Sequence, residues 1–197
     1  MNSSIRRQIR ASIAVKEALL ADAALSGMLQ AIVDAAVGAY RQGGKLLLAG
    51  NGGSAGDAQH IAGEMVNRFL FDRPGLPAIA LSSDPSVVTA IGNDAGFDRV
   101  FARQVEALGR AGDVFLAITT SGRSPNILRA LEACRERSLV RVAFTGQDGA
   151  GLAALCDHCL VVPSRETPRI QEAHILLAHI FCGLVEEALF GGEVRGA

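Results

Sequence analysis

Residues 45–54 read Lys-Leu-Leu-Leu-Ala-Gly-Asn-Gly-Gly-Ser, and this stretch decides the fold. Its first half is a short apolar run, which predicts a strand buried on both faces of a sheet. Its second half is a glycine-rich loop, and the pattern that follows predicts a helix from about residue 55 to 69. A buried strand, a small-residue loop and a helix in this order form the first unit of a parallel sheet covered by helices.

The same unit recurs along the rest of the chain. Short apolar runs predict four further strands, at residues 77–81, 113–118, 139–145 and 158–162. Helical patterns are predicted at residues 84–91, 97–108, 125–137, 149–155 and 168–190. Strands that alternate with helices indicate an α/β fold with a five-stranded parallel sheet flanked by helices.

Two amphipathic helices are predicted before this core. Residues 3–22 and 24–41 carry apolar side chains at three- and four-residue spacing, and two glycines end the second helix. A chain of 197 residues has the length of one domain. We therefore expect a single domain over residues 1–197, with a helical pair at 1–42 and an α/β core at 43–197.

The composition excludes several classes of protein. Nineteen Lys and Arg nearly balance 20 Asp and Glu, and only 5% of residues are aromatic, so a nucleic-acid surface is not indicated. The best apolar run, residues 175–185, is shorter than the ~20 residues that a membrane-spanning helix needs. No secretory signal opens the sequence. We expect a cytoplasmic protein that binds neither nucleic acid nor membrane.

Two loops rich in glycine and hydroxyl residues follow the first and third predicted strands. They are residues 50–54 and 119–124, and the second places four hydroxyls within six residues. Glycine lets a ligand approach the backbone, hydroxyls donate hydrogen bonds, and a helix N-terminus favours an anion. The pair of loops predicts a phosphorylated ligand, although Gly and Ser also favour ordinary turns. The first loop also satisfies a dinucleotide fingerprint, but no acidic residue stands where that fingerprint needs one.

Two helices carry side chains suited to acid–base or metal chemistry. His60 and Glu64 are four residues apart, and Gln171 and His179 lie about two turns apart on the last helix, where His174 is a competitor. Such a set suits a divalent metal such as Zn²⁺, and Glu64 with His179 is also a candidate acid–base pair. A solvated His–Glu pair and a core histidine are the alternatives.

The lysines and cysteines of the chain argue against Schiff-base chemistry and against a structural zinc site. The chain has only Lys16 and Lys45, and neither is expected near the ligand loops, so Schiff-base chemistry is not indicated. The four cysteines contain a single Cys-x-x-Cys, at positions 156 and 159, without the second pair that a structural zinc site needs. We expect ordinary thiols.

Four segments resemble the phosphoheptose isomerase family of SIS-fold proteins: residues 49–64, 90–94, 120–126 and 169–179. The resemblance covers nearly the whole chain, including the leading helices, and implies a flavodoxin-like SIS fold. Members of the family convert sedoheptulose 7-phosphate to D-glycero-D-manno-heptose 7-phosphate by enediol proton transfer. That reaction is the first step toward activated heptose for lipopolysaccharide or other surface glycans.

The resemblance also implies a role for each matching residue. One Zn²⁺ per subunit would be held by His60, Glu64, Gln171 and His179. Glu64 and His179 would be the acid–base pair, and Glu64 and Gln171 would also contact the substrate. The phosphate would be held by Ser54, Thr119, Thr120, Ser121 and Ser124. The sugar site would be lined by Asn51, Gly52, Gly53, Arg68, Asn93 and Asp94.

The family further implies a homotetramer with active sites at subunit contacts. The helical pair at 1–42 would serve in this packing, and the last helix would help to complete a neighbour's site. A related SIS protein that binds the replication initiator DnaA, without isomerase activity, supplies the main alternative. A sugar-phosphate sensor without chemistry is a third. The presence of Glu64, Ser121 and His179 favours the isomerase.

Overall fold

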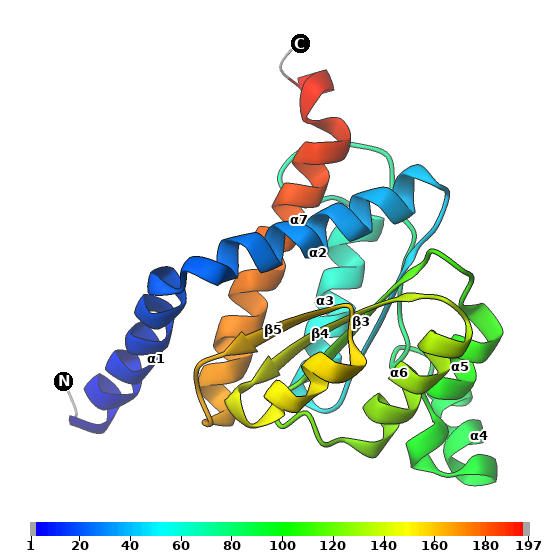
Figure 1. The fold of residues 1–197 in the computed structure, drawn as a ribbon, viewed down its shortest axis with the longest axis horizontal. Helices are drawn as coiled ribbons and strands as arrows, with labels where there is room; N and C mark the ends of the chain where they lie inside the picture. Colours follow the sequence, from blue (N-terminus) through cyan, green and yellow to red (C-terminus); the bar gives the residue numbers. More distant parts are fainter. Residues whose placement is uncertain (1–2, 195–197) are drawn as a thin grey trace.

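The computed structural model describes residues 3–194, and its centre is one five-stranded sheet (Figure 1). The strands are all parallel and stand in the order β2-β1-β3-β4-β5. They are β1 (Leu46–Gly50), β2 (Ala78–Ala80), β3 (Val114–Thr119), β4 (Val140–Gly146) and β5 (His158–Val162). The predicted five-stranded parallel sheet is confirmed, and the order is the flavodoxin-like one that the resemblance implied.

Helices cover both faces of this sheet. One face packs against α2 (Ala23–Arg41), α3 (Gly53–Val66) and α7 (Thr167–Val194). The other face packs against α5 (Ala102–Leu108), α6 (Pro125–Glu136) and the 3₁₀ helix η2 (Gln147–Leu155). Of two further elements, the short η1 (Phe97–Arg99) packs against α6, and α4 (Pro85–Ala95) packs against η1. Two hydrophobic cores result, one on each side of the strands.

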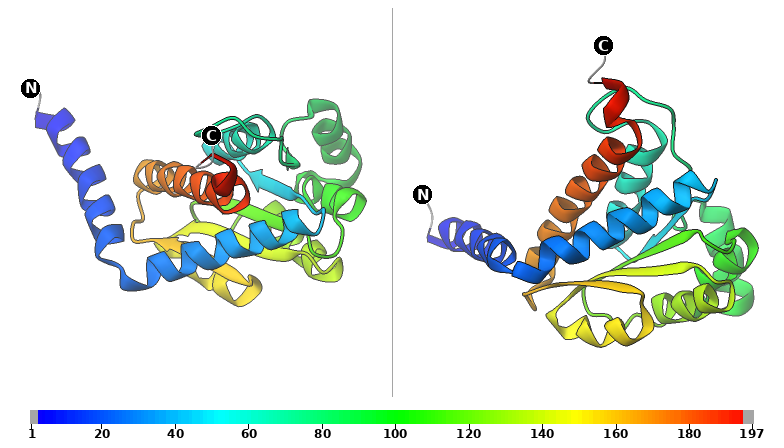
Figure 2. Two further views of the ribbon diagram at one scale, coloured as in Figure 1. Left: turned by 90° about the horizontal axis from the view of Figure 1, so that it is seen from above. Right: turned by 45° about the horizontal axis from the view of Figure 1, so that its top comes forward.

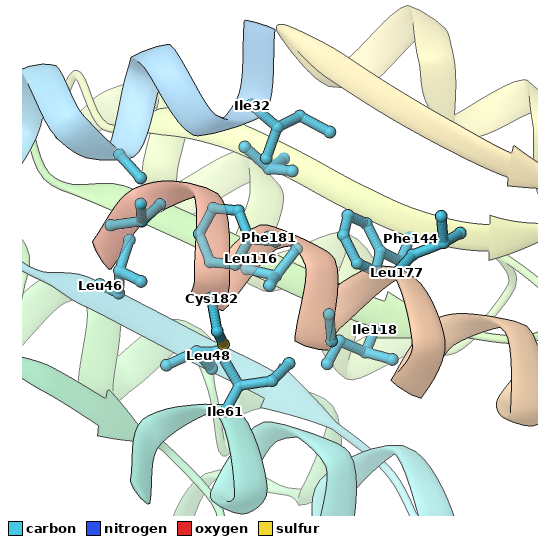
Figure 3. Packing of buried hydrophobic residues seen from close by; sticks show 14 of the residues in the cluster. Ile32, Leu46, Leu48, Ile61, Leu116, Ile118, Phe144, Leu177, Phe181 and Cys182 are labelled. Carbon is cyan, nitrogen blue, oxygen red and sulfur yellow. The ribbon is translucent and has the colours of Figure 1, made fainter. Parts of the chain in front are cut away.

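The central strands are apolar throughout because both of their faces are covered. Every residue of β1 and β3 is buried, and successive side chains enter opposite cores. Figure 3 shows the core under α7, where Phe181 and Cys182 lie among residues of β1, β3 and α3. Full burial of a Leu or Phe side chain stabilises a fold by ~1.5–3 kcal/mol, so α7 contributes strongly to stability.

The first helix, α1 (Ser3–Ala21), projects away from the rest of the molecule (Figure 2). Leu19 is its only buried residue, whereas Ile5, Ile9 and Ile13 are each about half exposed. The guanidinium of Arg169, at the start of α7, donates to the backbone carbonyl of Gln8 at 2.7 Å and holds this helix to the core.

Two predicted helices differ from the structure. The one predicted at 97–108 is divided into η1 and α5, because Val100 and Phe101 turn inward and are buried between them. The helix predicted to reach residue 69 ends at Val66, because the last carbonyls of α3 accept hydrogen bonds from the side chain of Arg73 instead of continuing the helix. Residues 67–77 then form a loop, called the 67–77 loop below.

The expectation that no segment is long and apolar enough to span a membrane is wrong. Within residues 3–194, two helices meet that criterion by length and composition, α2 and the Thr167–Gly191 part of α7, with mean hydropathies of 1.3 and 1.6. Both pack on the sheet, and core helices of soluble proteins have the same character, so this finding is weak evidence for a membrane.

Candidate active site

The first predicted ligand loop joins β1 to the N-terminus of α3, at the carboxyl edge of the sheet. Gly52 precedes the helix with φ of +56°, a conformation that favours glycine. A Cβ on Gly53 would lie 2.5 Å from the side-chain amide of Gln171 on α7. The loop therefore needs glycine for its turn and for the close approach of α7, and this contact brings Gln171 to the predicted site.

An amide pair joins this loop to the second one. The side chains of Asn51 and Asn126 donate to each other, each bond being 2.9 Å long, and Asn126 is only 3% exposed. Asn126 stands in the first turn of α6, just after the second loop. Its role was not predicted, because a single Asn inside a motif carries no sign of a partner 75 residues away.

The second loop, residues 119–124, is organised by its own hydroxyls. Thr119 is buried and accepts from the backbone N–H of Gly122, and the Ser121 hydroxyl accepts from the N–H of Arg123, both at 3.3 Å. A pocket of about 140 Å³ opens over the loop. It is lined by Thr120, Ser121, Arg123, Asp148, Arg165, Thr167 and Ile170. Hydroxyls with a guanidinium group suit an anion. Arg123 is available for this role, whereas Arg165 is paired with Asp148 at 3.3 Å, and neither arginine was among the predicted residues.

The predicted convergence of His60, Glu64 and His179 is confirmed. Their candidate ligand atoms all lie within 4.8 Å of one another, inside a single chain. The Nε2 atom of His60 is 3.1 Å from a carboxylate oxygen of Glu64 and 3.3 Å from Nε2 of His179. The ring of Phe69 stacks on that of His179, with centroids 5.5 Å apart and planes 16° apart. Two helices, α3 and α7, thus present three donors to one point.

The separations of His60 from the other two donors suit a tetrahedral metal ion. Zn–N bonds of ~2.0–2.1 Å at tetrahedral angles place two ligating nitrogens ~3.3 Å apart, which is the separation of the His60 and His179 nitrogens. Two imidazoles and a carboxylate are also the ligand types that Zn²⁺ prefers. Three protein donors leave room for a further ligand. The predicted one, the Gln171 amide, lies against Gly53 in the structure, and no described contact within residues 3–194 joins it to the triad.

The comparisons with known proteins agree with this geometry. Residues 11–146 match the family model described as SIS domain. The chain is 56% identical to phosphoheptose isomerase from Aneurinibacillus thermoaerophilus, over 96% of each chain. Among solved structures, it resembles phosphoheptose isomerases from Neisseria gonorrhoeae and Francisella tularensis. The Neisseria structure is 43% identical, with a TM-score of 0.86, and the match covers 93% of this chain and 97% of that one. The Francisella structure is 39% identical, with a TM-score of 0.89, and the match covers 95% of this chain and 100% of that one.

The chain belongs to the phosphoheptose isomerase family of SIS-domain proteins. Because the three donors converge within one protomer of this family member, the triad itself does not need a neighbouring copy.

The structure also gives the position and exposure of the other residues to which the family resemblance assigns a role. Thr120, Ser121 and Ser124 are half-buried in the second loop, whereas Ser54 is buried beneath the first. Arg68 is exposed at the start of the 67–77 loop. Asn93 and Asp94 are exposed near the end of α4 and bond to each other at 2.7 Å; no described contact within residues 3–194 joins them to the triad.

The exclusions drawn from lysine and cysteine agree with the structure of this family member. Lys45 is paired with the buried Asp113 at the amino end of the strands, opposite the ligand loops. All four cysteines are free, and burial raises the pKa of the Cys156 thiol to about 12. Within residues 3–194, the His60–Glu64–His179 group is the one candidate metal cluster of three or more such donors.

Proposed function

We infer that the protein is a phosphoheptose isomerase, which converts sedoheptulose 7-phosphate to D-glycero-D-manno-heptose 7-phosphate. The observation that carries this inference is the convergence of Glu64 and His179 on one point, beside loops built for an anion. The identity of 56% to a phosphoheptose isomerase over almost the whole chain supports it. The reaction would be the first step of activated-heptose synthesis for lipopolysaccharide or other surface glycans.

The two ligand regions are spaced for a long sugar chain. Gly53 at the first loop and His60 at the triad are seven residues apart on α3, a rise of about 10 Å along the helix. This is the length scale of an extended seven-carbon chain. The loops with Thr120, Ser121 and Ser124 would hold the phosphate, and the triad would then meet the C1–C2 end of the open-chain sugar.

Glu64 and His179 are placed to move a proton between neighbouring carbons. One of them removes the proton from C1 of the ketose, and the resulting cis-enediolate receives a proton at C2 to give the aldose. The partner acid donates a proton to the oxygen on C2 that was the carbonyl, and it takes back the proton of the C1 hydroxyl as the aldehyde forms. Phe69, stacked on His179, keeps the ring oriented and excludes water from one of its sides.

A zinc ion held by His60, Glu64, Gln171 and His179 would supply the electrophile. When bound, it polarises the carbonyl and stabilises the negative charge that develops on oxygen. The 3.3 Å separation of the two imidazole nitrogens supports the assignment of His60 and His179. The Gln171 amide instead lies against Gly53, about 10 Å along α3 from His60, so its place in the set rests on the family resemblance.

We further propose a cytoplasmic homotetramer. The half-exposed isoleucines of α1 leave an apolar stripe for another copy to cover. A groove of about 500 Å³ beside His179 is also mainly apolar, with Phe69, Leu176 and Ile180 in its lining, and a neighbouring subunit would close it. Four unpaired thiols suit a reducing compartment.

The deciding experiment is an NMR assay of sedoheptulose 7-phosphate turnover. The wild type should form the aldose phosphate, lose activity after treatment with a chelator and recover it with Zn²⁺. Glu64→Gln should lower kcat by ~10²–10⁴-fold, the range for a well-placed acid–base group, with circular dichroism unchanged. Glu132→Gln, a matched change on α6 on the opposite face of the sheet, should keep wild-type turnover.

The same assay tests the non-catalytic alternatives. A wild-type protein that binds sugar phosphate but never turns it over would be a sensor. Specific retention of DnaA by a protein without turnover would support the binding-protein alternative. A Glu64→Gln variant with near-normal kcat would overturn the assignment of the acid–base pair.

A further inference from the structure

A buried ion pair lies behind the proposed acid–base residues. The Nε atom of Arg73, on the 67–77 loop, is 3.0 Å from a carboxylate oxygen of Glu186 on α7. The Arg73 and Glu186 side chains are 1% and 0% exposed. A buried pair of charges contributes little net stability compared with apolar side chains of the same size, so stability alone is a weak explanation for it.

Glu186 fixes the backbone of the loop. Its two carboxylate oxygens accept from the N–H groups of Phe69 and Leu70, at 2.9 and 2.7 Å. Burial opposes ionisation of this carboxyl, but the two N–H groups and Arg73 outweigh it and hold its pKa below the usual value. The carboxylate is therefore charged and fully bonded at neutral pH, and the loop is tied to α7 at two successive residues.

Arg73 fixes the end of α3. Its guanidinium donates to the backbone carbonyls of Met65 and Glu64, at 2.6 and 2.8 Å. The last carbonyls of a helix have no partner within the helix, so Arg73 serves as the cap of α3. One of those carbonyls belongs to Glu64 itself.

The hydrogen bonds of Glu186 and Arg73 connect this ion pair to both proposed proton-transfer residues. Through the Phe69 backbone, Glu186 sets the position of the ring that stacks on His179. Through Arg73, it sets the backbone of Glu64. His179 and Glu186 are themselves seven residues apart on α7, two turns along nearly the same face.

We propose that Glu186 is a positioning residue for the isomerase reaction, acting through Arg73 on Glu64 and through Phe69 on His179. The inference rests on the proposed function. A displacement of about 1 Å in a catalytic group can cost 10²-fold in rate, so removal of this restraint should act on kcat.

The first test replaces the carboxylate by an amide. Glu186→Gln should lower kcat by ~10–100-fold and change KM for sedoheptulose 7-phosphate less than about threefold, because the phosphate loops are untouched. Asp113→Asn is the matched control. Asp113 is also buried, accepts from two backbone N–H groups and pairs with a cation, but it lies at the opposite edge of the sheet. This control should lose thermal stability and keep kcat.

The second test leaves the buried charges intact and removes only the stacking. Phe69→Leu should lower kcat to a similar extent, whereas Phe69→Tyr, which keeps the ring, should retain it. If Glu186 acts on His179 through Phe69, the double variant Glu186→Gln/Phe69→Leu should lose less than the product of the two single effects.

A third readout needs neither substrate nor metal. In the metal-free protein, the Phe69 ring should shift the His179 ring protons upfield in the NMR spectrum, and Glu186→Gln should reduce that shift while Asp113→Asn preserves it. Unchanged kcat and ring shifts in Glu186→Gln, or an equal loss of kcat in Asp113→Asn, would overturn the inference. Absence of wild-type turnover would instead contradict the proposed function.

Discussion

At the scale of single residues, the buried His174 on α7 affects how the stability of the fold depends on pH. It is 1% exposed, neither ring nitrogen has a hydrogen-bond partner among residues 3–194, and its nearest aromatic neighbour is Phe144. Burial lowers the pKa of His174 to about 4, and the backbone of Thr145 opposes the shift only in part. The ring therefore stays neutral in the folded protein near pH 7.

The depressed pKa predicts a loss of stability in acid. The folded pKa is below the unfolded value of 6.5, so the unfolded chain binds the proton more tightly and stability falls from about pH 6.5 toward pH 4. The full loss is ~3 kcal/mol. Urea unfolding across this range should show a shallower pH dependence for His174→Gln than for the wild type. Parallel curves for the two proteins would contradict the prediction.

At the scale of elements, α4 depends on its first residue. Asp84 precedes the helix and accepts from the N–H groups of Ser86 and Val87, at 2.9 and 3.1 Å. No residue of α4 is fully buried, and only Val88 and Ile91 pack against the core, so the cap should contribute measurably to the helix that carries Asn93 and Asp94.

Loss of this cap has a predictable cost. Asp84→Ala should lower the free energy of unfolding by about 1 kcal/mol, whereas Asp84→Asn, which also caps well, should change it by only a few tenths. The measurement is the urea midpoint at constant m-value. An Asn variant as unstable as the Ala variant would show that charge, and not the capping bond, matters at this position.

The elements could be predicted from sequence because their signals are local. The apolar run Leu46–Ala49 is buried on both faces, and each predicted strand lies within a residue or two of its place in the structure. Helix ends were less predictable where a distant group decides them. Arg73 ends α3 and Glu186 holds Arg73, and the pairing of these two charges over 113 residues leaves no trace in a local pattern.

The same reasoning applies to the candidate site. His60 and Glu64 could be paired from their helical spacing, but Asn126, Arg123 and Arg165 could not be assigned, because their roles depend on loops that meet only in the folded sheet. That His179 joins the pair was a hypothesis from side-chain chemistry and helical spacing, with His174 as its competitor, and the family resemblance favoured His179.

At the scale of the whole molecule, the projecting helix α1 is the feature on which the proposed tetramer can be tested. Ile5, Ile9 and Ile13 form a stripe along it, 53%, 49% and 48% exposed. A stripe of this kind is stabilised when a second helix covers it.

A charge on that stripe should dissociate the assembly. Ile9→Glu should lower the mass in size-exclusion chromatography with light scattering from four chains to one or two, because the carboxylate would have to be buried. Ala14→Glu places the same charge on the other side of α1 and should leave the mass unchanged. A wild-type protein that elutes as a single chain would contradict the proposed tetramer.

The position of α7 after all five strands has a consequence for biosynthesis. A nascent polypeptide that has not yet reached Thr167 lacks His179 and leaves without its α7 cover the part of the core that includes Leu48 and Leu116, although α2 and α3 already pack on the same face. The helix that covers this part of the core, α7, also carries His179, the last donor of the triad. Closure of this core and acquisition of the last donor therefore depend on the same helix, and a translation product that stops before Thr167 has neither.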